Sequence, residues 1–136
     1  MTEPDPERAA PAEPLGPLAT AGAFALVLLL TVLLAVWGAF LVPFRIGATL
    51  VPLCWVIALV GNVALGRAGG RLVGRTGAVL PALLWLLIAF MFGSRRAEGD
   101  LVVTGSVTGL VFLLAGAVGG AVSYSLFLTR TAAARR

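Results

Sequence analysis

The residues best suited to acid and base chemistry are Glu98 and Asp100, two carboxylates separated by one glycine. A catalytic carboxylate pair needs an apolar surrounding that keeps one member protonated while the other stays ionised. Arg95 and Arg96 precede the pair, and neighbouring guanidinium groups favour the ionised form of both carboxylates. We therefore expect a charged loop at a water interface, with no catalytic residue, in a protein that is not an enzyme.

Metal and cofactor chemistry has few candidate ligands in this chain. It contains no histidine, the commonest metal ligand and general base, and its one cysteine, Cys54, lies inside an apolar segment. The sequence therefore predicts neither a metal site nor a cofactor.

Arginines that recur in a glycine-rich segment form the second candidate site. Arg67, Arg71 and Arg75 lie within residues 66–77, which we expect to form a flexible, cationic inner loop. This segment lacks the Gly-Lys-Ser/Thr ending of a phosphate-binding loop. The isoelectric point is near 11.1, but the arginines are spread over segments between apolar runs, where they signal topology more than nucleic-acid binding. We expect these three residues to contact anionic lipid headgroups or a partner protein, and we expect no nucleic-acid partner.

The elements that must position these residues are apolar helices. The chain is 60% hydrophobic with a mean hydropathy of +1.03, too apolar for a soluble domain of 136 residues. Four runs free of charge can each house the roughly 20 residues needed to cross a bilayer, and only helices or closed barrels satisfy their backbone there. We predict an all-α membrane protein, a four-transmembrane-helix bundle of two antiparallel hairpins, with helices at 19–42, 46–65, 77–93 and 103–128.

The distribution of arginine predicts the orientation. With a cytoplasmic N-terminus, seven arginines lie on the inner side and three on the outer side. The inner set is Arg8, Arg67, Arg71, Arg75, Arg130, Arg135 and Arg136, and the outer set is Arg45, Arg95 and Arg96. We expect a multi-pass protein of the inner, cytoplasmic membrane with both termini in the cytoplasm.

The chain divides into a transmembrane domain and two tails. Residues 1–17 are acidic and rich in proline, which predicts a disordered cytoplasmic tail rather than a secretory signal. Residues 18–129 form the predicted transmembrane domain, and residues 130–136 form a basic cytoplasmic tail.

Small residues in the last span predict a helix-packing face. Spacings of 4, 7, 4 and 3 residues bring five of them to one side of a helix, where a smooth groove lets another helix approach closely. These residues are Gly105, Gly109, Gly116, Gly120 and Ser123. Within the second span, Asn62 could be a polar ligand on an ion path. We favour instead a hydrogen bond to another helix, or a side chain that reaches the inner membrane interface.

The segment from Arg95 to Gly105 contains the sequence Glu98-Gly99-Asp100-Leu101-Val102. It resembles the outer loop of an actinobacterial family of small four-helix integral membrane proteins of unknown function. The resemblance extends to the hydropathy profile of residues 20–128 and implies the fold and topology, without implying an activity. Arg95, Arg96, Glu98, Gly99 and Asp100 carry this outer-loop motif, although Ala97 stands where the family pattern has proline.

These patterns favour a non-enzymatic membrane protein that acts by association, as an accessory subunit or a self-assembling bundle. The expected partners are the lipid bilayer with its anionic headgroups and either another membrane protein or further copies of this chain. The alternative is a small oligomeric channel or permease.

Overall fold

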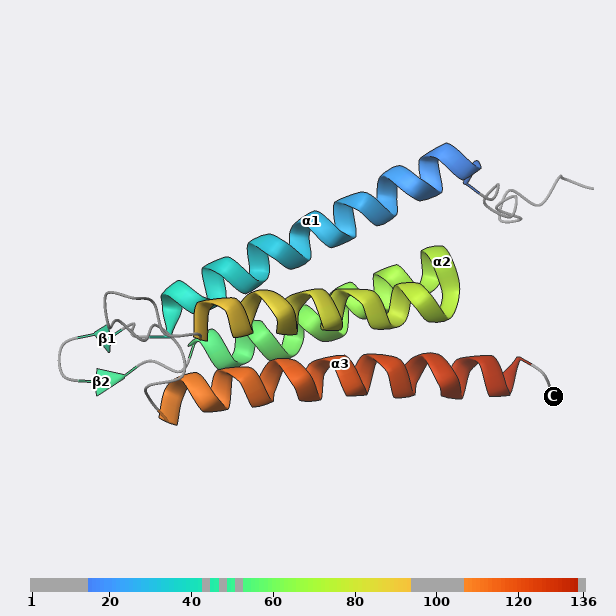
Figure 1. Cartoon of the computed structure of the whole chain (residues 1–136). Coiled ribbons are helices and arrows are strands. Elements are labelled where there is room, and N and C mark those ends of the chain that lie inside the picture. The colour runs from blue at the N-terminus through green and yellow to red at the C-terminus, as the bar shows by residue number, and fades with distance from the viewer. Residues whose placement is uncertain (1–14, 43–44, 47–48, 51–52, 94–106, 135–136) are drawn as a thin grey trace, which may run out of the picture.

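The computed structural model describes residues 15–42, 45–46, 49–50, 53–93 and 107–134 of the chain. They form the helix α1 (Pro17–Leu41), the strands β1 (Arg45–Ile46) and β2 (Thr49–Leu50), and the helices α2 (Leu53–Gly93) and α3 (Val107–Ala133). The two short strands pair antiparallel, with Arg45 opposite Leu50 and Ile46 opposite Thr49. Helices therefore dominate the described residues (Figure 1).

The prediction of a four-helix bundle is wrong, because the described residues contain three helices. The spans expected at 46–65 and 77–93 belong to one element, α2, whose helical backbone is interrupted only at Val73 and Gly74. At this point α2 reverses, so its first arm (53–72) and second arm (75–93) run back along each other (Figure 1). The segment 66–77, expected to be a flexible loop, is therefore helical on both sides of a two-residue break.

Glycine makes this tight reversal possible. Gly74 has φ of 68° and ψ of −141°, a conformation that residues with a Cβ rarely adopt. Gly69 and Gly77 face each other across the reversal, where a Cβ on either would collide with the backbone of the other. The glycines of this segment thus allow the two helical arms to touch. From the sequence alone, so many glycines had indicated a flexible loop.

Prolines mark the starts of the first two helices. Pro17 occupies the first turn of α1, where a backbone N–H would have no acceptor within the helix, so the N–H that proline lacks costs no hydrogen bond. The second helix was expected from residue 46, but β1 and β2 occupy 45–46 and 49–50, and α2 begins at Leu53, directly after Pro52. Proline is favoured at the start of a helix, so the position of Pro52 in the sequence agrees with a start at Leu53 rather than at residue 46.

Two aromatic residues fill the centre of the bundle. Trp85 of α2 and Phe112 of α3 are both fully buried, and their ring centroids lie 5.0 Å apart at an interplanar angle of 54°. Small side chains surround them, including Ala35 and Ala39 of α1 and Ala58 of α2. Small residues around a few large rings let helix backbones approach closely, the packing typical of helices in membranes.

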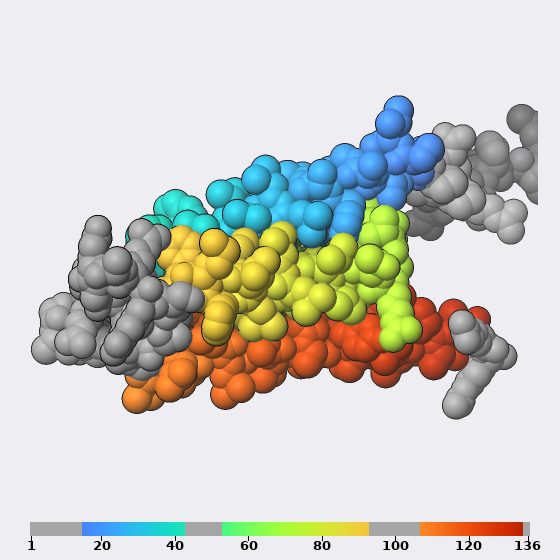
Figure 2. All heavy atoms as spheres, viewed as in Figure 1, coloured from blue at the N-terminus to red at the C-terminus, as the bar shows by residue number. Residues whose placement is uncertain are grey.

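The outer surface of the bundle is apolar on every helix. Large hydrophobic side chains are exposed along α1, α2 and α3, among them Trp37, Phe40, Leu87, Phe90 and Leu114. Residues 17–41, 53–92 and 107–133 are each long and apolar enough to cross a membrane. The second arm of α2 lies between α1 and α3 in the space-filling view (Figure 2). The structure is therefore that of an all-helical bundle suited to a membrane.

Candidate functional site

Close contact between α2 and α3 runs along the glycines of α3. A Cβ on Gly116 would overlap the indole ring of Trp85, and one on Gly120 would lie 2.5 Å from Cβ of Ala82. A Cβ on Gly119 would lie 2.6 Å from the carbonyl oxygen of Leu59. Both arms of α2 therefore meet α3 at positions where only glycine fits.

Of the small residues expected to form this face, four are described and all four are buried: Gly109, Gly116, Gly120 and Ser123. Gly105 lies outside the described residues. Gly119 was missed, although its place three residues after Gly116 and beside Gly120 could have signalled a second small-residue contact. The contact of Trp85 with Gly116 could not be predicted from the sequence, because only the size of the tryptophan side chain pointed to it.

Three polar atoms in this contact region have no hydrogen-bond partner among the described residues: Oδ1 of Asn62, Nε1 of Trp85 and Oγ of Ser123. Asn62 does donate from Nδ2 to the Ala58 carbonyl, at 2.9 Å. Ser123 is 1% exposed, and its hydroxyl lies against Gly66. Apolar helix packing therefore encloses several hydrogen-bonding groups that are not fully used.

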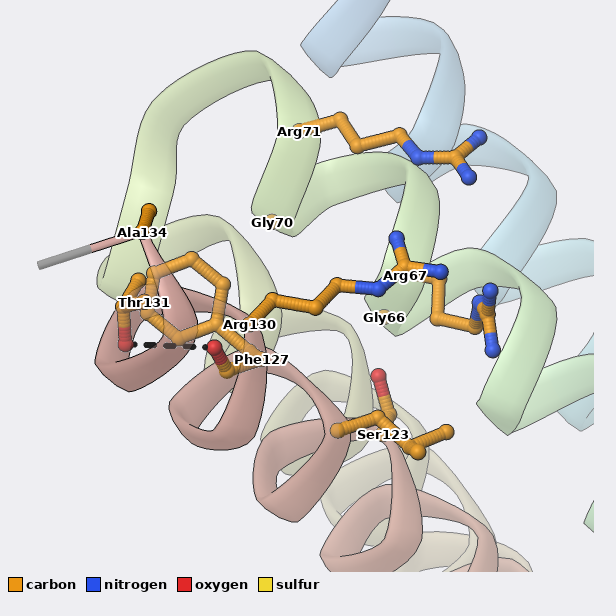
Figure 3. A pocket seen from close by; sticks show the side chains of 10 residues that line it. Gly66, Arg67, Gly70, Arg71, Ser123, Phe127, Arg130, Thr131 and Ala134 are labelled. Atoms are coloured by element: carbon orange, nitrogen blue, oxygen red, sulfur yellow. Dashed lines mark hydrogen bonds between the residues drawn. The ribbon is translucent and has the colours of Figure 1, made fainter. Parts of the chain in front are cut away.

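A pocket of about 220 Å³ opens between α2 and α3 near the reversal of α2 and the end of α3 (Figure 3). Its lining from α2 consists of Gly66, Arg67, Gly70 and Arg71. Its lining from α3 consists of Ser123, Leu126, Phe127, Arg130, Thr131 and Ala134. The pocket thus combines apolar walls with three guanidinium groups and the buried Ser123.

The charges of this pocket are uncompensated among the described residues. All six acidic side chains of the chain belong to residues 3–13 and 98–100, which the structure does not describe. Arg130 extends from α3 toward the arm of α2 that carries Arg67, and Arg71 lies one helical turn further along that arm (Figure 3). Among the described residues, this part of the bundle therefore carries an excess of positive charge.

The three arginines expected to act together are divided by the reversal of α2. Arg67 and Arg71 line the same pocket, whereas Arg75, in the second arm, places its guanidinium carbon 5.8 Å from the ring centroid of Tyr124. This is a cation–π contact with α3. Arg130, expected only to begin a basic tail, lies in the last turn of α3 and joins the pocket instead.

The opposite end of the α2–α3 contact contains a hydrogen bond between the two helices. Trp55 donates from Nε1 to the carbonyl oxygen of Thr108, at 3.1 Å. The outer-loop motif, Arg95, Arg96, Glu98, Gly99 and Asp100, lies outside the described residues. The predicted role of that motif, and its resemblance to a family loop, therefore stay predictions.

Comparisons with family models, with curated proteins and with solved structures found no match to this chain. Among the described residues, no three His, Cys, Asp or Glu side chains come together as a potential metal site. Function is therefore inferred from the geometry of the described residues.

Proposed function

We propose that this chain is an integral protein of the cytoplasmic membrane that acts by association, as an accessory subunit or a self-assembling bundle. The observation that carries this proposal is an apolar groove between α1 and α2, of about 440 Å³, on the surface that would face lipid. Leu30, Leu33 and Trp37 of α1 line it together with Gly61 and Ala64 of α2. Small residues beside large apolar ones suit the approach of another membrane helix.

A second groove, of about 570 Å³, supports the same proposal. It lies between α2 and α3 and is lined mainly by Leu59, Val60, Val63, Val118 and Val122. Apolar surface alone does not bring helices together in a bilayer, because lipid chains are equally apolar. Close packing against a neighbouring helix does, and each of the two grooves is a surface on which such a helix could pack.

The orientation with both termini in the cytoplasm is part of this proposal. It is supported by the excess of arginine on the side expected to be cytoplasmic. It is also supported by the position of the described chain ends, which lie at the same end of the bundle as the reversal of α2 (Figure 1).

Purification of the full chain from its native membranes in a mild detergent tests the proposal. A heterologous protein recovered in a fixed ratio, or a defined homo-oligomer, is the expected result. The matched control replaces Ala64, an exposed groove residue, by Trp, which should release the partner while leaving the fold intact. Recovery of the chain as a monomer, with no other protein in a fixed ratio, would contradict association.

A channel or permease made of several copies stays the alternative hypothesis. Trp85 and Phe112 fill the described centre of one chain, so a path for solute would have to lie between copies. Solute flux in proteoliposomes that contain the homo-oligomer would favour this alternative over a bundle with no transport role.

A further inference from the structure

The pocket between α2 and α3 contains hydrogen-bond donors that have no acidic partner among the described residues. The side chains of Arg67, Arg71 and Arg130 line it, and no acidic side chain is among the described residues. Ser123, almost completely buried, turns its unpartnered hydroxyl toward α2 at the inner side of this pocket (Figure 3). Donors of this kind bind an anionic group such as a phosphate, which guanidinium groups hold by charge-assisted hydrogen bonds.

The remaining walls of the pocket indicate a ligand with an apolar part. Leu126 and Phe127 line it between Ser123 and Arg130. The 27 residues of α3 extend about 40 Å, longer than the roughly 30 Å hydrocarbon core of a bilayer. If α3 crosses the membrane, its last turns reach the headgroup layer, where phosphate groups and acyl chains meet.

We propose that this pocket binds the phosphate group of one anionic phospholipid, with its acyl chains leaving along the apolar wall. A zwitterionic lipid carries the same phosphate but brings an ammonium group, which the three arginines repel. This inference rests on the membrane location within the proposed function and does not depend on any protein partner. Lipid binding by the isolated chain and recovery of a partner can therefore fail separately.

Native mass spectrometry of the full, delipidated chain tests the proposal. The probes are dioleoylphosphatidylglycerol and dioleoylphosphatidylcholine, which share acyl chains and a phosphodiester and differ in headgroup charge. One phosphatidylglycerol per chain should bind in preference to phosphatidylcholine. Arg130→Gln should weaken phosphatidylglycerol binding about fivefold, the equivalent of about 1 kcal/mol, and leave phosphatidylcholine binding unchanged.

Arg75→Gln is the matched control, because it removes the same charge near the same end of the bundle but outside this pocket. It should change phosphatidylglycerol binding less than twofold. Equal losses for Arg75→Gln and Arg130→Gln would show diffuse attraction by net charge and overturn the site. No loss for Arg130→Gln would also overturn it.

Two further measurements test the contribution of Ser123 and distinguish a lipid from free phosphate as the ligand. Ser123→Ala should weaken phosphatidylglycerol binding about two- to threefold through its lost hydroxyl, whereas an unchanged affinity would remove Ser123 from the site. Millimolar inorganic phosphate should not displace phosphatidylglycerol from the unmodified chain. Displacement would identify a site for free phosphate and contradict the proposal of a lipid.

Discussion

The indole ring of Trp85 occupies the space that a side chain on Gly116 would need, so α2 and α3 touch where one residue is largest and the other has no side chain. Gly116→Leu should therefore force the helices apart and destabilise the bundle by about 3 kcal/mol or more. The apparent melting temperature in mild detergent measures this loss. Gly22→Leu is the control, since nothing lies within 4 Å of a Cβ at Gly22 and its melting temperature should hardly change. Equal stability of Gly116→Leu and the unmodified chain would contradict the contact.

The same contact predicts coupling between its two residues. Gly116→Ala should destabilise the bundle because the added Cβ overlaps the Trp85 ring, and Trp85→Leu should destabilise it by leaving a cavity. The double variant should be more stable than the sum of the two losses predicts, by about 1 kcal/mol or more, since the added methyl group enters the vacated space. Strict additivity would show that the two residues do not touch.

The reversal of α2 depends on the backbone conformation of Gly74. Gly74→Ala should cost about 1–3 kcal/mol, because its combination of positive φ and strongly negative ψ is almost restricted to glycine. Val73→Ala, at the adjacent position, should cost less, since the φ of −132° at Val73 is open to any residue. Thermal unfolding of the two variants compares them directly, and equal small losses would argue against this geometry.

Asn62 offers a test of whether its polarity matters beyond packing. Asn62→Leu removes one hydrogen bond to the Ala58 carbonyl but also removes an oxygen that lacks a partner, so the net change in stability should stay within about 1 kcal/mol. Unfolding and oligomeric state in detergent measure this. A loss of stability above about 3 kcal/mol would mean that Asn62 belongs to a polar network, and would contradict a role in helix packing alone.

The apolar helices could be predicted from the sequence, because long runs without charge have few alternatives in a bilayer. The tight reversal of α2 into two contacting helical arms could not, since glycines at 69, 70, 74 and 77 indicate a loop unless the contact between the two arms is known. The pairing of strands 45–46 and 49–50 could not be predicted either, because two residues are too few to show the alternation of polar and apolar side chains that marks a strand.

The candidate site was predictable only in part. Arg67 and Arg71 follow from the cationic segment, but the separation of Arg75 depends on the reversal at Val73 and Gly74. Arg130 is more than 50 residues away in the sequence and joins the pocket through the packing of α3 on α2. Long-range contacts of this kind leave no periodic signal in one sequence.

The arrangement of the whole chain in the membrane is tested most directly by reporter fusions that are active only outside the cytoplasm. Because α2 reverses and the described ends lie at one end of the bundle, fusions after Arg71 and after Arg136 should be inactive, and fusions after Arg45 and after Arg96 should be active. An active fusion after Arg136, with an inactive one after Arg71, would mean that the chain ends on the opposite side and would contradict this account.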